Sequence, residues 1–189
     1  MLIQFNSENI SYNHFRVYLI NIYKNLKEIN IVKPLVWDIP VCYDNIFSFD
    51  MNEYSNKISL TKDEIIQLHS SKTYYLHMYG FLPGFMYLGG LDSKLQISRK
   101  TIPSRRVLKG SVAVGGSQTG IYPSNSPGGW YVIGNTPINL FDASNLNQPV
   151  AFPDSNYVKF SPVSIKEYEL IKDEVEKSEY KFIIREFNG

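Results

Sequence analysis

The residues with the clearest chemical potential lie in a stretch without charge. Residues 111–141 contain no Asp, Glu, Lys, Arg or His, although 20% of the whole chain is charged. Glycines in this stretch let backbone N–H groups approach a ligand closely. Neutral side chains supply further hydrogen-bonding groups: Gln118, Thr119, Tyr122, Ser124, Asn125 and Ser126. An apolar pocket with a few such groups suits a small amide, carboxylate or carboxyphosphate.

A basic segment precedes this neutral stretch. Its cations are opposed by one acid, Asp92, and they are Lys94, Arg99, Lys100, Arg105, Arg106 and Lys109. Two interpretations remain open. The neutral stretch is either simply the buried core of a β structure with a solvated basic flank, or a binding pocket with cations at its rim.

Histidines, metals and nucleotides give weaker signals. The three histidines are scattered, and His69, near the end of a short helix, is the one that we would test as an acid/base group. Metal-ligand spacing is absent, so we predict no metal site. The segment 115–120, Gly-Gly-Ser-Gln-Thr-Gly, resembles a phosphate cradle but lacks the lysine of a P-loop.

Bulk properties favour an ordinary globular protein. The chain has 189 residues and a net charge of +1, which gives no indication of nucleic-acid or membrane binding. No apolar run approaches the ~20 residues that span a bilayer. Without a basic leader, and with one cysteine, Cys42, we expect a cytoplasmic protein without an internal disulfide.

The elements at the two ends are predicted to be helical and extended. Leu2–Phe5 predicts a strand, and Ser11 a helix N-cap before apolar residues at helical spacing: Phe15, Leu19, Ile22, Leu26 and Ile29. Ser164 is a second candidate N-cap, and Lys181–Phe187 predicts a strand. We expect this C-terminal helix and strand to pack beside the N-terminal strand and helix, because a lone two-element unit cannot bury its apolar face.

The central elements are short and β-prone. Leu35–Tyr43 predicts a strand near an edge or with a bulge, because it contains Pro40. Thr61 and Glu64 fit the capping-box pattern at the start of a short helix. Eleven of the twelve glycines lie between Gly80 and Gly134. The short apolar pieces among them predict a small barrel or sandwich; they are Ser111–Val114, Ile121–Tyr122, Trp130–Ile133 and Ile138–Phe141. We therefore divide the chain into a partial α+β unit, 1–32, a β domain, 33–162, and a helix–strand extension, 163–189.

A series of motifs resembles one family. They are Leu68-His69 with Thr73-Tyr74, Gly80–Leu91, Pro103 with Arg106-Val107, Gly110–Gly116, Gln118–Pro123, Ser126–Trp130, Ile133-Gly134 and Thr136-Pro137, with Trp37–Tyr43 before them. This series is similar to the carboxyltransferase-domain family, subdomains C and D. That family contains the B-type subunit of 5-oxoprolinase, allophanate hydrolase subunit 1 and the kinase inhibitor KipI.

The resemblance implies both a fold and a function. The fold is mainly β, a cyclophilin-like barrel over about 35–162 with a small, incomplete two-layer α+β unit. The function is that of one subunit of an ATP-dependent 5-oxoprolinase, or of a related allophanate or urea-amide hydrolase, which we expect to be inactive alone. The implied partners are a homologous C-type barrel subunit and a larger hydrolase subunit, with ATP shared with or supplied by them. The alternative is a KipI-like inhibitor that binds a sensor histidine kinase.

We combine this resemblance with the chemistry of the neutral stretch. The candidate catalytic residues are His69, Gln118 and Tyr122, and the candidate substrate-binding residues are Gly84, Arg106, Gln118, Thr119, Tyr122, Ser126 and Gly128. Gln118 and backbone N–H groups would bind a carbonyl or carboxylate, and Arg106 would neutralise charge. The chain departs from the family pattern at Ser104 and Asn135, where basic residues are usual, and its N-terminal domain corresponds only to the second half of the family's.

Overall fold

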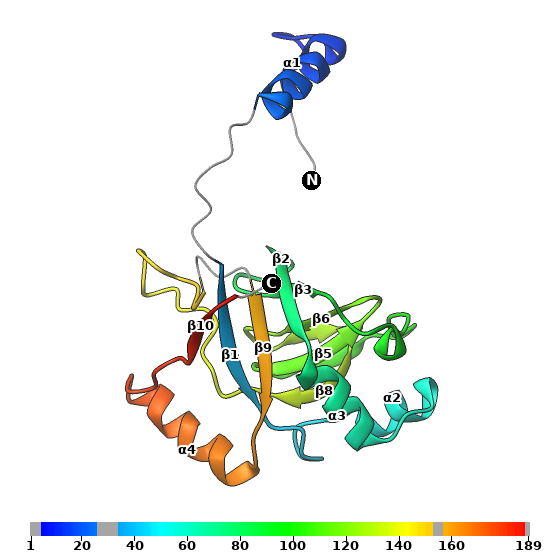
Figure 1. Ribbon diagram of the computed structural model, residues 1–189, viewed down its shortest axis with the longest axis vertical. Helices are drawn as coiled ribbons and strands as arrows, with labels where there is room; N and C mark the ends of the chain where they lie inside the picture. Colours follow the sequence, from blue (N-terminus) through cyan, green and yellow to red (C-terminus); the bar gives the residue numbers. More distant parts are fainter. Residues whose placement is uncertain (1–4, 26–33, 153–156, 188–189) are drawn as a thin grey trace. The chain divides into compact units, whose positions relative to one another are not determined.

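The computed structural model describes residues 5–25, 34–152 and 157–187 (Figure 1). The chain forms two compact units, 1–32 and 33–189, and we call the second the barrel unit. The elements in chain order are α1 (Tyr12–Lys24), β1 (Leu35–Val41), α2 (Met51–Ile58), α3 (Lys62–Ser71), β2 (Thr73–Tyr79), β3 (Met86–Gly89), η1 (Ser93–Leu95), β4 (Ser104–Val107), β5 (Ser111–Gly115), β6 (Gln118–Ile121), β7 (Ser126–Gly128), β8 (Tyr131–Asn135), β9 (Tyr157–Pro162), α4 (Ile165–Glu176) and β10 (Ile184–Glu186).

The N-terminal unit contains the predicted helix. The Ser11 side chain caps α1 by accepting a hydrogen bond from the His14 backbone N–H, as its residue type favours. Phe15 stacks on Phe5, with ring centroids 4.5 Å apart. The other predicted features, the strand from Leu2 and the apolar positions Leu26 and Ile29, fall largely outside the described residues.

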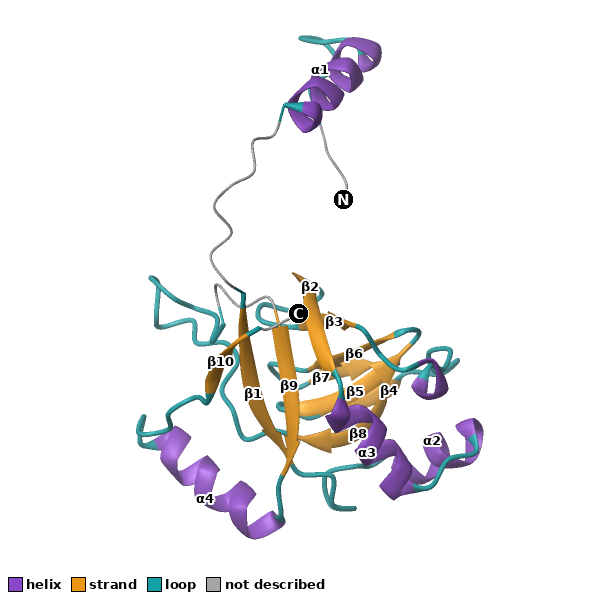
Figure 2. Cartoon of the chain, viewed as in Figure 1, coloured by secondary structure: helices purple, strands orange, loops and turns teal. Residues whose placement is uncertain are grey.

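The barrel unit is built on one curved sheet. Its eight strands follow the order β10-β1-β9-β2-β3-β6-β5-β8, and every neighbouring pair is antiparallel except β1 and β9. Cys42 and Asn135 exchange backbone hydrogen bonds of 2.9 and 3.0 Å, which join the end of β1 to β8. The sheet therefore curls into a partial barrel, and helices α2, α3 and α4 lie toward one end of its strands (Figure 2). This confirms the mainly β fold that the glycine-rich motifs imply.

Several local predictions are confirmed. The capping box at Thr61 is present, with Glu64 as the reciprocal partner. Ser164 caps α4 as predicted, and the structure adds a second capping box there with Glu167. Pro40 pairs with Ser161 of β9 on one side. On its other side the pairing of β1 with β10 has already ended at Trp37, so no β10 residue requires the N–H that proline lacks.

Two predictions at the strands are corrected. Residues 138–141 form no strand, because Phe141 makes only an isolated bridge to Val150. The C-terminal strand is confined to β10, and it pairs with β1 inside the barrel unit, where Arg185 and Asp38 form an ion pair. Segment 163–189 falls within the barrel unit, 33–189. Its packing against Leu2–Phe5 stays a prediction.

Side chains along the strands point alternately to the two faces of the sheet, and each face packs into a core of its own. Val112, Val114 and Ile121 point into the barrel with the large cluster that includes Ile39, Met86, Leu88 and Phe160. The intervening residues point to the opposite face of the same strands. There a second cluster forms beside the two-stranded β4–β7 ribbon, from Phe85, Val107, Ala113, Tyr122, Trp130 and Val132. Burial on both faces explains the lack of charge in β5 and β8, whose residues are all buried.

Candidate functional site

A cavity of about 340 Å³ lies over the second cluster, and we call it the aromatic pocket. Five rings line its wall: Phe81, Phe85, Tyr87, Tyr122 and Trp130. The remaining lining comes from two cations and from proline and glycine positions: Arg99, Lys100, Pro103, Pro127, Gly128 and Gly129. Its volume is at the lower end of the range for small-molecule sites.

The rings of the wall hold one another in fixed orientations. Phe85 lies at the centre, edge-on to Tyr122 and to Trp130 with centroid distances of 5.1 and 5.6 Å. Tyr87 tilts against Phe85 at 4.8 Å. Such edge-to-face pairs add to the stabilisation from burial, so the wall is a rigid surface that needs no ligand to form.

Two glycines make room for this wall. A Cβ at Gly115 would lie 2.6 Å from the Trp130 ring, and a Cβ at Gly128 would lie 2.2 Å from the Tyr122 hydroxyl oxygen. Any side chain at either position would displace a pocket ring. The glycines of the family motifs therefore shape the pocket as well as its turns.

Phe81 stands at the mouth of the pocket in an unusual conformation. Its φ is +64°, and 61% of the residue is exposed. A bulky residue in the left-handed region is a conformational outlier that costs about 1–3 kcal/mol. Its ring is edge-on to Phe85 at 5.6 Å and to Tyr122 at 6.3 Å.

The two cations of the rim differ in their surroundings. Lys100 Nζ donates to Asp50 Oδ1 at 2.5 Å and to Ser104 Oγ at 2.9 Å. Asp50 Oδ2 in turn accepts from the Val132 backbone N–H at 2.8 Å. Arg99 instead lies 5.5 Å from the centroid of Trp130, and within the described part of the chain no carboxylate pairs with it. Arg99 is therefore the cation that keeps its charge available to a ligand.

Tyr122 is a hydrogen-bond donor at neutral pH. Burial raises the pKa of Tyr122 to about 12, although a hydrogen bond from the Trp130 backbone and the nearby Arg99 charge act in the opposite direction. The phenol therefore stays protonated near pH 7. It can bind a carbonyl or carboxylate oxygen, but it does not act as a general base there.

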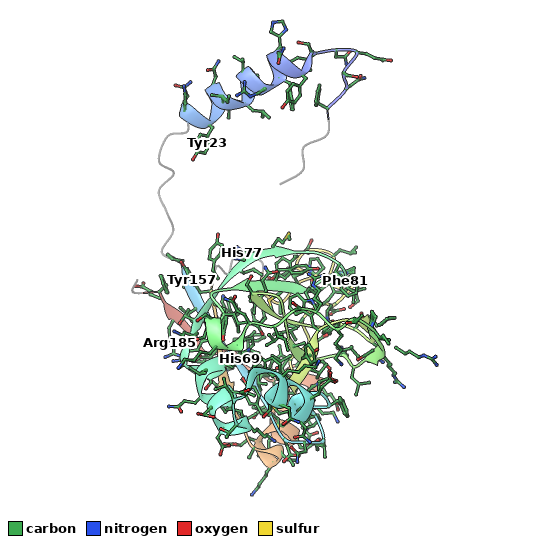
Figure 3. All side chains as sticks on the ribbon, turned by 90° about the vertical axis from the view of Figure 1, so that its right-hand side faces the viewer. Tyr23, His69, His77, Phe81, Tyr157 and Arg185 are labelled. Atoms are coloured by element: carbon green, nitrogen blue, oxygen red, sulfur yellow. The ribbon has the colours of Figure 1, made fainter. Side chains whose placement is uncertain are left out.

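His69 is fully buried, and it is not among the residues that line the pocket. Figure 3 shows it well away from Phe81 at the pocket mouth. Its Nδ1 is 2.8 Å from the Tyr43 hydroxyl, and its Nε2 is 2.9 Å from Thr119 Oγ1. Since the Thr119 hydroxyl donates to the Ala113 carbonyl at 3.0 Å, it accepts from His69, which fixes the neutral tautomer with the proton on Nε2. Burial lowers the pKa of His69 to about 3. Both nitrogens are occupied, so the geometry argues against the predicted acid/base role.

The other predicted residues divide between the pocket and its surroundings. Tyr122 and Gly128 line the pocket. Ser126 begins the same strand as Gly128, and its buried Oγ has no hydrogen-bond partner among the described residues. Gln118 is half-buried at the start of β6, and the Thr119 hydroxyl is hydrogen-bonded to His69.

Two further predicted residues lie outside the pocket lining. Gly84, with φ +83°, is a backbone turn against Leu140 and Phe141. Arg106 is exposed on β4. The cations that line the pocket are instead Arg99 and Lys100. Both belong to the basic segment before the neutral stretch, so the sequence indicated the right segment but not the right residue in it. No signal indicated Asp50, which lies fifty residues before its partner.

The family-specific departures have structural explanations. Asn135 is buried, where its Nδ2 donates to the Lys109 carbonyl at 2.9 Å and its Oδ1 accepts from the Tyr168 hydroxyl at 2.8 Å. Ser104 accepts from Lys100. Both residues therefore serve internal hydrogen bonds.

Metal-binding clusters and membrane-spanning helices are absent from the described ranges 5–25, 34–152 and 157–187. These ranges hold no group of three His, Cys, Asp or Glu side chains that could bind a metal ion. None of the helices in these ranges is long and apolar enough to span a bilayer.

Comparison with known proteins identifies the family. The family model described as carboxyltransferase domain, subdomain C and D, matches residues 1–152. The chain belongs to this family. It is 39% identical over 137 residues to the 5-oxoprolinase B subunit of Bacillus subtilis, covering 72% of this chain, and 44% identical over 123 residues to that of Haemophilus influenzae, covering 65%. The chain spans 57% of the length of each of these relatives.

Solved structures support the same fold. A conserved uncharacterized protein from Pyrococcus horikoshii aligns with a TM-score of 0.66 and 35% identity, over 87% of this chain and 74% of that one. Urea amidolyase of Kluyveromyces lactis aligns with a TM-score of 0.77 over 97% of this chain and 13% of that one. Its identity of 17% supports likeness of fold alone.

Proposed function

We propose that this chain is the B-type subunit of an ATP-dependent 5-oxoprolinase, which opens 5-oxoproline to glutamate. In that reaction water adds to the lactam carbonyl, the ring C–N bond breaks, and the products are a carboxylate and an ammonium group. The observation that carries the proposal is the kinship, at 39% and 44% identity, with proteins named as the B subunit of 5-oxoprolinase. The aromatic pocket is the part of this chain whose size and polarity suit such a substrate.

The pocket supplies binding groups and lacks a self-sufficient catalytic pair. The Tyr122 phenol is protonated at neutral pH, Lys100 is paired with Asp50, and His69 is buried elsewhere. We therefore infer that activation of a water or of the amide uses groups beyond the described residues of this chain. We accordingly expect the isolated chain to be inactive, with a C-type barrel subunit and a larger hydrolase subunit as its partners.

The aromatic pocket does not fit a nucleoside triphosphate. Its lining offers one cation without a carboxylate partner, Arg99, and the described residues contain no acidic cluster for a divalent ion. Triphosphate sites use several cationic or backbone donors and a metal ion. We therefore assign ATP binding to the partner subunits or to a site shared with them.

The test is reconstitution. The chain is purified alone and together with the C-type and hydrolase subunits of its own source, and phosphate and glutamate are measured with ATP and 5-oxoproline. We expect activity that needs 5-oxoproline and all subunits, with none from the chain alone; allophanate is the comparison substrate.

Three outcomes would contradict the proposal. Activity of the isolated chain would place the catalytic groups within it. Preference for allophanate would move the substrate to the related amide class. Inhibition of a co-purifying histidine kinase, without any hydrolysis, would support the KipI-like alternative.

A further inference from the structure

We propose that Arg99 is the anion anchor of the aromatic pocket and that Phe81 is kept in its left-handed conformation to cover the bound ligand. The ligand class that fits is a small ring with a single carboxylate, its carboxylate on Arg99 and its ring against the aromatic wall. This inference rests on the proposed function, and it assigns roles to two residues that sequence reasoning did not select.

Among the described residues, one cation of the pocket lining, Arg99, lacks a carboxylate partner. Lys100 is 11% exposed at its side chain and is neutralised by Asp50, which is 15% exposed and also held by a backbone N–H. Arg99 has no such partner within the described residues. One unpaired cation matches one carboxylate, and a dianion would leave a charge without a partner in a partly desolvated site.

Arg99 also lies against the aromatic wall. Its guanidinium lies over the Trp130 ring, 5.5 Å from the centroid, and that ring in turn packs closely on Gly115. A guanidinium placed by an aromatic ring loses less freedom when it binds. Its planar set of donors can bind a carboxylate through two parallel hydrogen bonds.

The conformation of Phe81 belongs to a tight turn between β2 and β3. The Leu82 N–H donates to the Gly80 carbonyl at 2.7 Å, so Phe81 is the central residue of a three-residue turn. Such a turn with a positive central φ is rare and strained. Among the described residues, three that are not glycine have positive φ: Ser59, Phe81 and Ser178. Ser59 caps the end of α2 and Ser178 follows the cap of α4, where left-handed residues are common. Phe81 ends no helix, and 61% of the residue faces solvent. An exposed ring in a strained backbone contributes little to stability, so a ligand contact at the pocket mouth explains why it is kept.

Binding can be followed by the two tryptophans of the chain. In a ¹H–¹⁵N spectrum of the full chain, 5-oxoproline should shift the indole signal of Trp130. Trp37 is the internal control, because its ring packs on Phe152 and Phe182 and is not part of the pocket lining. The same lactam ring without its carboxylate, 2-pyrrolidone, should bind at least about 10-fold more weakly, because a charge-assisted hydrogen bond is lost.

Two pairs of variants separate the roles. Arg99→Gln should weaken binding about 10- to 100-fold, whereas Arg106→Gln, in the same basic segment but outside the pocket, should not. Phe81→Gly should weaken binding and raise the midpoint of urea unfolding, because strain is relieved. Ser59→Gly should raise the midpoint in the same way and leave binding unchanged. A purely structural Phe81 would give the opposite result, a lower midpoint with intact affinity.

The outcomes distinguish this inference from the proposed function. The anchor is wrong if Trp130 does not respond to roughly 10 mM 5-oxoproline or if Arg99→Gln binds as the parent does. A reconstituted complex that hydrolyses 5-oxoproline with an unchanged KM in Arg99→Gln refutes the anchor and leaves the function standing. Arg99-dependent binding of small carboxylates, in a complex that hydrolyses none of them, refutes the function and leaves the anchor standing.

Discussion

The buried histidine of the barrel core makes stability depend on pH in a calculable way. His69 stacks on Phe160 at 4.5 Å, and its two nitrogens are engaged by Tyr43 and Thr119. Burial lowers its pKa from 6.5 to about 3. Below pH 6.5 the unfolded chain therefore takes up a proton at this position that the folded chain refuses.

The sign and size follow from proton linkage. Because the unfolded state binds more protons, the free energy of unfolding falls as the pH falls. Between pH 7 and pH 5 the folded histidine stays neutral while the unfolded one becomes almost fully charged, and the loss amounts to about 2 kcal/mol. Carboxyl groups contribute little over this range, since their unfolded pKa values lie near 4.

The assay is urea unfolding at pH 7, 6 and 5, with His69→Gln as the matched control. A glutamine amide can accept from Tyr43 and donate to Thr119, but it does not titrate. His14 and His77 remain in both proteins, so the difference between the two pH profiles isolates His69. A parent protein with no loss between pH 7 and pH 5, or an equal loss in His69→Gln, would refute the buried neutral histidine.

Two further predictions concern the pocket frame. Gly128→Ala should lower the free energy of unfolding by about 1–3 kcal/mol, because its Cβ would lie 2.2 Å from the Tyr122 hydroxyl oxygen. The control is Gly129→Ala, whose Cβ would have its nearest atom 3.8 Å away, and its free energy of unfolding should stay within about 0.5 kcal/mol of the parent value. Equal effects of the two variants would contradict the geometry. Asp50→Asn should lower the free energy of unfolding in urea by about 1–3 kcal/mol, because Lys100 then keeps a largely buried charge without its counter-charge. Adding Lys100→Met should recover part of this loss. A further loss in the double variant would argue against an unpaired Lys100 charge as the cause.

Local chemistry in the sequence predicted the ends of helices well. Ser11, Thr61 and Ser164 each cap a helix, and Thr61 forms the expected capping box with Glu64. Such signals act over three or four residues, so neighbouring side chains decide them. The dense glycines likewise predicted a β structure, and the family motifs indicated a barrel.

Contacts between distant segments were the part that the sequence could not provide. Arg106 and Arg99 are equally plausible rim cations by spacing, and only strand register puts Arg106 on the exposed face of β4 while Arg99 lies over Trp130. The pairing of Lys100 with Asp50 depends on how α2 meets β8. His69 is another example. Its position near the end of a helix is compatible with the rim of a pocket and equally with the barrel core, and only the fold shows that it is buried in the core.

The pairing of β1 has a consequence for how the chain is made. Ile39 of β1 lies beside Phe160 of β9, and the other neighbour of β1 is β10, so both of its partners come from the last part of the chain. Its bridge to β8, through Cys42 and Asn135, also spans most of the barrel unit. During synthesis β1 therefore emerges before β9 and β10, and both of its edges stay unpaired until those two strands have been made. The barrel unit therefore folds late, and β1 is the segment that a chaperone would need to shield meanwhile.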